Sequence, residues 1–442
     1  MRALALGFLC VTVTFAADTN GSAKPTFYKD VLPVLQRDCQ GCHRPGEAGP
    51  MSFLTYDSTR PWAKSMKAAV LSKKMPPWFA DPHYGKFAND RSLSEAEINT
   101  LVAWADSGAA AGDPKDAPKP VAWVEGWSIG KPDMIIQIPK AIPVPVSGVI
   151  DYQYVIVPTG FTEDKYVQIA EARPTDRKHT HHIIAFIREP GSPWLKDAPV
   201  NQAFVPERGR GGDGGGGGGG LGGGDFLAGY APGTIPDQLK PGQAHVIKAG
   251  SDIVFQLHYT ADGKTGEDQS EVGVIFAKEK PTERVLTLAT VQPKLDIPAG
   301  EANYTVEAKI TLQADSTMVF MLPHMHYRGK SFQYRLTYPD GKTETILNVP
   351  NYTFLWQLSY YLQEPKFLPK GTTVESTAVY DNSVNNALNP DPTKEVHWGE
   401  QSWDEMMVGF FDVAVPLNVT QMDLMRPPRP AKKDTGSGSD RF

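Results

Sequence analysis

The stretch Cys39-Gln40-Gly41-Cys42-His43 has the residue types and spacing that covalent haem attachment requires. Two thiols three residues apart can add to the two vinyl groups of a haem, and the histidine then lies beneath the iron as proximal ligand. A thioredoxin-like dithiol or half of a zinc ribbon would also use a cysteine pair, but a ribbon needs a second pair. The only other cysteine is Cys10, in a leader-like segment. The motif therefore predicts a c-type haem.

A methionine is the expected sixth ligand of this iron, and Met75 is the best candidate. It lies in Lys73-Lys74-Met75-Pro76-Pro77-Trp78, where two prolines favour a rigid, extended loop. Met51 and Met66 are the alternatives; the first follows the haem motif closely and the second falls in a helix-like stretch, which favours packing roles for both. His/Met ligation closes the iron to oxygen and indicates electron transfer.

Two helical patterns flank the haem motif. A first helix is predicted by apolar residues at helical spacing, namely Phe27, Val31, Val34 and Leu35. Ser94-Glu95-Ala96-Glu97 is a capping box, which predicts that a last helix begins there. Together these patterns predict a small all-α cytochrome c domain over residues 25–112.

The pattern changes to β after a Pro-, Lys-, Asp- and Ala-rich linker at residues 113–130. Short runs of β-forming residues follow between Gly, Pro and Asp, at Met134–Ile138, Val155–Val157, Tyr166–Ile169, Ile253–Leu257 and Thr317–Met321. One or two β-sandwiches are expected from these runs. Residues 209–225 are nearly all glycine and lack the Lys-Ser/Thr ending of a phosphate-binding loop, so we expect a flexible surface insertion.

Composition and the N-terminal residues indicate an exported globular protein. The chain has 442 residues, is 40% hydrophobic and carries a net charge of −6, which implies neither nucleic acid nor an acidic membrane surface as partner. Residues 1–17 have a basic start, an apolar run and small residues before a polar stretch, as in a secretory signal peptide. We expect a periplasmic or extracellular location. No later stretch approaches the roughly 18 apolar residues of a membrane span.

Histidines in the β region are the second group of residues that could do chemistry. Of ten in the chain, three cluster at His179, His181 and His182, one is His258, and two form His324-Met325-His326. Residues two apart on a strand point to the same face, so His324 and His326 can hold one metal ion together. Three further histidines are interpreted as structural, namely His83, His245 and His397.

The surroundings of these histidines resemble a known family. Four motifs occur in the order and context of the copper type II, ascorbate-dependent monooxygenases, the family of peptidylglycine α-hydroxylating and dopamine β-monooxygenase: His181-His182-Ile183-Ile184, Phe255-Gln256-Leu257-His258-Tyr259, His324-Met325-His326 and Asp404-Glu405-Met406. The resemblance covers about residues 131–420. It implies two jelly-roll-like β-sandwich domains, at residues 131–285 and 286–420, each with one copper ion, and leaves residues 421–442 as a flexible tail.

The resemblance also assigns ligands. The electron-accepting copper would be held by His181, His182 and His258, and the copper that binds oxygen by His324, His326 and Met406. A thioether is soft and favours Cu(I), so a His/His/Met set independently favours copper over zinc.

Two alternatives remain open at these ligands. Adjacent residues of a regular strand point to opposite faces, so His181 and His182 can share a metal only at a strand end or irregularity. His179 with His181 is the geometric alternative. Met407 competes with Met406, which only the resemblance favours.

The chain departs from the peptide-amidating members of the family at two positions. Where those enzymes have a basic residue and a tyrosine that anchor the substrate carboxylate, this chain has Leu322 and Phe410. The family's disulfides are also absent. An apolar or uncharged small substrate is therefore expected instead of a peptidylglycine.

These observations together predict an exported haem- and copper-containing oxidoreductase. We expect it to hydroxylate a C–H bond of a small molecule with O2, and to receive electrons through the haem from an external donor, either a small reductant or a redox protein. A non-catalytic periplasmic electron-transfer or copper-binding protein is the alternative, and a β-sandwich recognition module is a third possibility.

Overall fold

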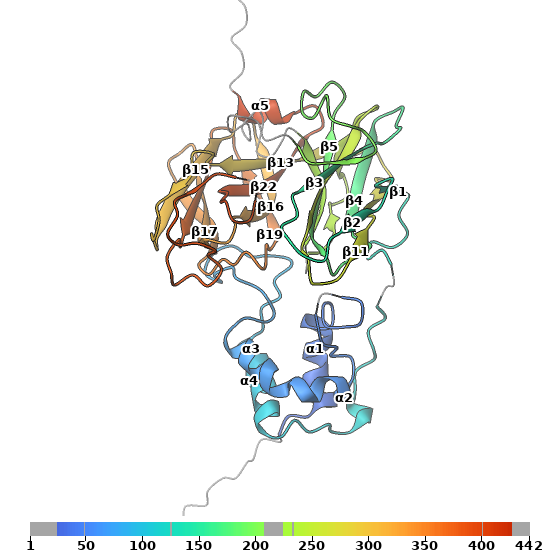
Figure 1. Ribbon diagram of the computed structural model, residues 1–442, viewed down its shortest axis with the longest axis vertical. Helices are drawn as coiled ribbons and strands as arrows, with labels where there is room; N and C mark the ends of the chain where they lie inside the picture. Colours follow the sequence, from blue (N-terminus) through green and yellow to red (C-terminus); the bar gives the residue numbers. More distant parts are fainter. Residues whose placement is uncertain are drawn as a thin grey trace, which may run out of the picture.

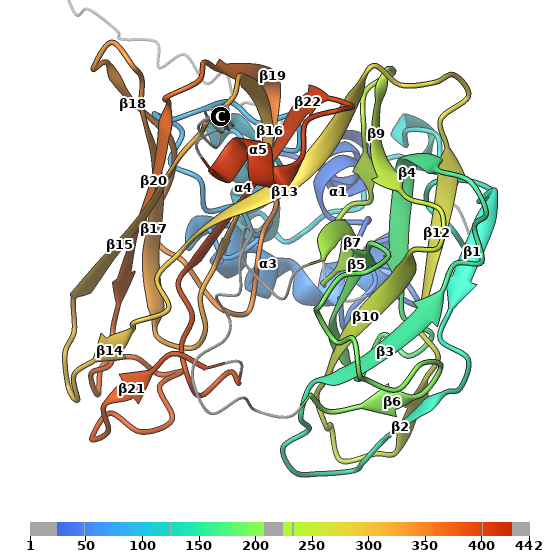
Figure 2. The ribbon, with the colours of Figure 1, turned by 90° about the horizontal axis from the view of Figure 1, so that it is seen from above.

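The computed structural model describes residues 24–47, 49–123, 126–206, 224–231, 234–399 and 401–426. The predicted signal peptide, Cys10 and residues 209–223 of the glycine-rich insertion lie outside the described residues. Helices α1 to α4 gather at one end of the molecule, and two β-rich lobes lie side by side at the other (Figures 1 and 2).

The helical part of the chain is built from short elements. They are η1 (Phe27–Val31), α1 (Leu32–Asp38), α2 (Tyr56–Thr59), η2 (Arg60–Trp62), α3 (Ala63–Leu71), α4 (Glu95–Asp106) and η3 (Pro114–Asp116). Phe27, Leu35, Leu101 and Trp104 are buried in a small core of their own. The predicted capping box is confirmed, because the Ser94 hydroxyl accepts a hydrogen bond from the amide of Glu97 and the Glu97 carboxylate accepts one from the amide of Ser94.

The prediction of a separate all-α cytochrome c domain is wrong. Strands make up 36% of the chain and helices only 13%. Residues 72–94, which we call the arm, leave the helices and pack on the second β lobe. Phe87 forms a β-bridge with Leu362 and is buried in that lobe's core, where the rings of Trp78 and Tyr360 lie 5.0 Å apart. The apolar residues of the arm pack in a β core and not against other helices. Their spacing along the chain is therefore not helical.

The first β lobe is a sandwich of two sheets. One layer contains β1 (Met134–Gln137), β12 (Glu271–Phe276), β4 (Lys165–Arg173) and β9 (Gln243–Ile247). The other contains β6 (Ala203–Phe204), β3 (Gln153–Pro158), β10 (Asp252–Tyr259), β5 (Thr180–Arg188) and β7 (Asp225–Tyr230). Apolar residues from both layers, such as Val167, Val272, Ile183 and Phe255, are fully buried between them. Three short strands lie at the margins, namely β2 (Ile142–Val144), β8 (Asp237–Gln238) and β11 (Gly266–Asp268).

The second β lobe repeats this arrangement. One layer contains β13 (Glu283–Val291), β22 (Val408–Pro416), β16 (Ser316–His324) and β19 (Tyr360–Leu368). The other contains β15 (Tyr304–Thr311), β20 (Thr373–Tyr380), β17 (Gly329–Thr337) and β18 (Thr343–Val349), and β14 (Asp296–Ile297) pairs separately with β21 (Val396–His397). The side chains of Met321, Phe332 and Phe411 fill the space between the layers.

One continuous sheet joins the two lobes. β9 pairs with β13 in parallel, with Gln243 opposite Glu283, so a single strand order runs through both lobes. The β-sandwich expectation is therefore confirmed at the level of layers. After β22 the chain forms α5 (Gln421–Met425), whose Leu424 is buried in the second core, so the predicted tail does not begin at residue 421. Residues 427–442 lie outside the described residues.

The described helices are all short. The longest is α4, with 12 residues, and none of the helices in the described ranges combines the length and hydropathy needed to cross a membrane.

Candidate metal centres

The haem motif forms a tight turn directly after α1. The amides of Cys42 and His43 both donate to the Cys39 carbonyl, at 3.2 and 2.9 Å, so the two thiols and the imidazole belong to one turn. Burial raises the pKa of Cys39 to about 12 and also raises that of Cys42, and neither thiol forms a disulfide. Both sulfurs are therefore free of disulfide bonds, as covalent attachment of a haem requires.

The ring of His43 is held in one orientation. Its Nδ1 lies 3.3 Å from the Met51 carbonyl, which can only accept, so Nδ1 carries the hydrogen and Nε2 keeps a lone pair. Phe53 stacks on the ring at 4.5 Å between centroids. A Cβ at Gly49 would lie 2.6 Å from Nδ1, so a larger residue there would displace the ring. These contacts fit a proximal haem ligand.

The three candidate methionines lie in different surroundings. Met66 is buried in the helical core, as expected for a packing residue. Met51 packs against the helical core, and its carbonyl contacts His43 on the side away from Nε2. Met75 is half-buried in the arm, three residues before Trp78. The sixth-ligand prediction stays with Met75.

The first histidine cluster forms at a β-bulge. In the β5/β10 pair, His182 lies opposite His258 and Thr180 lies opposite Tyr259, which leaves His181 as the extra residue of the bulge. His181, His182 and His258 each offer one ring nitrogen within 4.8 Å of the others. The strand irregularity that two adjacent histidines need in order to share a metal is therefore present.

The imidazoles of this cluster are neutral. Burial lowers the pKa of His181, lowers that of His182 well below its usual value, and lowers that of His258 to about 3. Nδ1 of His181 and Nδ1 of His182 face each other at 3.3 Å. Nδ1 of His258 is buried and has no hydrogen-bond partner among the described residues. Three converging nitrogens, one of them unsatisfied, fit a bound metal ion.

His179 does not belong to this cluster. Its Nδ1 lies 2.5 Å from the Asp176 carboxylate and its Nε2 lies 2.9 Å from that of Asp262, so both ring nitrogens are already used. These carboxylates, first of all Asp176, raise the pKa of the buried His179. Residues 176–179 therefore form a structural turn before β5, which the spacing of Asp176 and His179 could have indicated.

The second histidine cluster lies at the end of β16. The rings of His324 and His326 are 5.1 Å apart between centroids. Nδ1 of His324 donates to the amide oxygen of Gln357 at 2.6 Å, and Nδ1 of His326 donates to the Asp404 carbonyl at 3.3 Å. Both rings therefore present Nε2, and Nε2 of His326 is buried without a partner among the described residues. Burial lowers the pKa of His324 to about 4 and that of His326 well below its usual value.

Strand register separates Met406 from Met407. His324 lies opposite Val408 where the β16/β22 pairing ends. Met406 packs with Val408 on one face of the sheet, whereas Met407 is buried in the sandwich core on the other. Of the two methionines, Met406 thus shares the face of the histidines.

Glu405 supports this second cluster, a role that sequence reasoning missed although the residue stands in the quoted Asp-Glu-Met motif. It is fully buried, and its carboxylate accepts hydrogen bonds from the amides of His326 and Arg328, at 2.8 and 2.6 Å. Burial raises the pKa of Glu405 to about 8. Its contacts fix the backbone that follows β16.

The half of the sheet face next to His324 is apolar. Leu322 and Phe410 lie opposite each other in the β16/β22 pair, and both are half-buried. The Phe410 ring lies 6.3 Å from that of His324 between centroids. Leu322 and Phe410 therefore form one apolar pair beside the second cluster.

The haem motif contacts the strand end that carries the first cluster. Glu47, just after the motif, forms an ion pair of 2.5 Å with Arg177, and the Arg177 guanidinium lies 5.9 Å over the ring of Tyr230. Tyr230 is in turn paired with Ile183, next to His182. A series of contacts from Glu47 through Arg177 and Tyr230 thus connects the haem motif with the strand of the first cluster.

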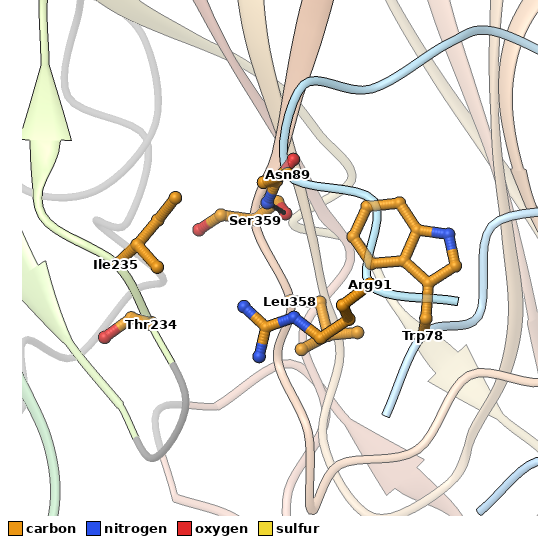
Figure 3. Close-up of a pocket in the computed structure, with 7 residues that line it drawn as sticks. All are labelled: Trp78, Asn89, Arg91, Thr234, Ile235, Leu358 and Ser359. Carbon is orange, nitrogen blue, oxygen red and sulfur yellow. Dashed lines mark hydrogen bonds between the residues drawn. The ribbon is translucent and has the colours of Figure 1, made fainter. Parts of the chain in front are cut away.

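The arm also contacts both β lobes. Figure 3 shows a small cleft where residues of the arm meet both lobes, lined by Trp78, Asn89, Arg91, Thr234, Ile235, Leu358 and Ser359. The Asn89 amide donates to the Ser359 carbonyl at 2.8 Å. Burial raises the pKa of Cys42, and the positive charge of Arg91 opposes this rise.

Comparisons with known proteins identify no family. No family model matches the chain, and no match is found among curated proteins. Among solved structures the chain is similar to that of infectious bursal disease virus Gx strain, with 10% identity over 66% of this chain and 76% of that one, and a TM-score of 0.19. It is also similar to Sulfolobus Turreted Icosahedral Virus, with 10% identity over 65% of this chain and 89% of that one, and a TM-score of 0.25. Nothing is inferred from scores this low.

Proposed function

We propose that this protein is an exported haem- and copper-containing oxidoreductase, an O2-dependent monooxygenase that hydroxylates a C–H bond of a small apolar substrate. One observation carries the proposal. Two sets of neutral histidines lie in adjacent β-sandwiches, and each set contains a buried ring nitrogen without a partner in the described part of the chain. The exported location rests on the predicted signal peptide.

The donor atoms favour copper at both clusters. Three imidazoles suit copper or zinc, whereas two imidazoles and the thioether of Met406 form a soft set that favours Cu(I). When bound, copper would supply one-electron chemistry and oxygen activation. The neutral state of the imidazoles favours metal binding, because a protonated ring cannot be a ligand.

Some residues around the clusters would orient the metal ligands, and others would bind the substrate. Gln357 and the Asp404 carbonyl would orient His324 and His326 so that Nε2 faces the metal. Leu322 and Phe410 would bind the apolar part of the substrate beside His324. The absence of a charged anchor at these two positions is the reason for proposing an apolar substrate.

The haem would serve the copper clusters as an electron relay. Cys39 and Cys42 would hold it covalently, and His43 and Met75 would close both axial positions to oxygen. The contacts of Glu47 with Arg177 and of Arg177 with Tyr230 would keep the haem loop against the strand end of the first cluster. An external donor would reduce the haem.

The test is oxygen uptake coupled to product formation. Protein matured with a cytochrome c assembly system and loaded with copper should consume O2 and release hydroxylated product from small apolar substrates. His324→Ala should abolish product, whereas His83→Ala, at an exposed histidine, should not. Uptake without product in every substrate tested would favour the alternative of a non-catalytic electron-transfer or copper-binding protein.

Haem attachment is tested separately. Replacement of Cys39 and Cys42 by Ala should leave no haem colour in the denatured chain after acid-acetone extraction. Retention of covalent haem in the double variant would refute the assignment of this motif.

A further inference from the structure

The loop at residues 350–359, between β18 and β19, contacts both histidine clusters. The Tyr352 hydroxyl accepts a hydrogen bond from the Met325 amide at 3.1 Å and donates one to its carbonyl at 2.7 Å. The loop is thereby fixed to the residue between His324 and His326. Five residues further on, Gln357 holds Nδ1 of His324. The loop is therefore anchored on both sides of Phe354.

Phe354 lies between the two clusters. Its ring stacks on His181 of the first lobe, with centroids 5.2 Å apart and planes at 12°. The same ring meets His326 of the second lobe edge-on, at 6.1 Å and 89°. The side chain is 5% exposed, and Tyr327 packs against it at 4.8 Å. One aromatic ring is thus shared by one candidate ligand from each cluster.

The space between the clusters is narrow and filled, because one buried ring reaches from His181 to His326. A second contact, between the Gln401 amide and the Asp151 carboxylate at 3.3 Å, joins the lobes beside the clusters.

We propose that Phe354 is a positioning residue that sets the spacing of the two metal sites and keeps the path between them dry. The inference rests on the proposed function. With copper bound, one electron would pass from the site of His181, His182 and His258 to that of His324, His326 and Met406. The first ion is then oxidised and the second reduced by one electron, and no bond or proton is transferred. The Phe354 ring would fill the space between the two sites, so that the electron crosses packed atoms instead of water.

The experiment measures spacing and electron transfer, without turnover, in full-length copper-loaded protein. Pulsed dipolar EPR on the fully oxidised protein should give one narrow copper–copper distance. Freeze-quench EPR after anaerobic addition of one electron equivalent follows how fast the electron moves between the two sites, whose signals differ because only one has a thioether.

Phe354→Leu should keep two copper ions, broaden the distance distribution and slow the transfer, because the two sites lose the ring that fixes their spacing. Phe354→Tyr retains the ring and should behave like the parent. Phe332→Leu is the matched control, because Phe332 is an equally buried ring in the core of the same lobe. It should lose stability without changing spacing or rate.

The outcomes separate the two hypotheses. Two bound copper ions with an unchanged distance and rate in Phe354→Leu would overturn the role of Phe354 and leave the proposed function standing. Failure of the parent protein to hold two copper ions would overturn the proposed function and this inference with it. Equal effects of Phe354→Leu and Phe332→Leu on the rate would reduce Phe354 to a packing residue and also overturn the inference.

Discussion

The two histidine clusters are built by different means, although each occupies one β-sandwich. The first uses a β-bulge to turn His181 and His182 toward His258, and their Nδ1 atoms meet. The second uses the regular alternation of a strand end, and hydrogen bonds on Nδ1 make His324 and His326 present Nε2. Local backbone irregularity thus selects the ligands in one lobe, and neighbouring side chains orient them in the other.

This difference indicates that the two clusters have different roles. The first cluster offers three imidazoles and lies near the haem loop, which suits receipt of electrons. The second adds Met406 and lies beside the apolar pair of Leu322 and Phe410, which suits binding of oxygen and an apolar substrate. The two clusters should therefore respond separately to substitutions.

The largest effect is expected from removal of a ligand. His258→Ala should remove the first metal site and His324→Ala the second, because each substitution removes one ligand from a set of three. Metal analysis should then fall from about two copper ions per chain to about one. A variant pair that loses the same copper ion in both cases would show that the clusters form a single site.

A smaller effect is expected from a residue that orients a ligand. Gln357→Leu removes the acceptor on Nδ1 of His324, and such outer partners typically contribute about 10–100-fold in metal affinity. Copper titration should show this loss at the second site alone. An equal loss of copper affinity at the first site would contradict the idea that Gln357 orients a ligand of the second site alone.

The two methionines provide a matched pair. Met406→Ala should weaken Cu(I) at the second site by about tenfold, or about 1.4 kcal/mol, with a smaller effect on Cu(II). Met407→Ala should leave affinity unchanged and instead lower the free energy of unfolding by about 2–5 kcal/mol, because it opens a cavity in the core. Competition titration and chemical denaturation distinguish the two, and the reverse pattern would exchange their assignments.

The smallest effect on metal binding is expected at His179. His179→Gln removes ion pairs with Asp176 and Asp262 and should cost about 1–3 kcal/mol of stability. Both copper ions should remain, as judged by metal analysis of the folded variant. Loss of the first copper would return His179 to the ligand set.

Sequence reasoning reached the residues that lie in regular patterns. The capping box at Ser94 and the β runs such as Ile253–Leu257 follow from local rules, and each is found as predicted. The face shared by His324 and His326 follows equally from strand alternation. Local periodicity was therefore sufficient to predict a feature wherever a single helix or strand determines it.

The rest depends on contacts between distant segments. The arm carries no periodic signal because its Phe87 is buried by strands about 270 residues away in sequence, such as that of Leu362. The bulge at His181 appears only when β5 pairs with β10. Phe354 and Gln357 lie in a loop without regular periodicity, and only the approach of the two lobes gives them a role.

The central claim is that the haem passes electrons to the copper clusters, and stopped-flow mixing tests it most directly. Pre-reduced protein is mixed with oxygen while the haem absorption is followed, with and without copper. Because His/Met ligation closes the haem to oxygen, copper-loaded protein should reoxidise much faster than copper-free protein, and His258→Ala should approach the copper-free rate. Equal reoxidation in all three samples would contradict the relay, even if haem and copper were both bound.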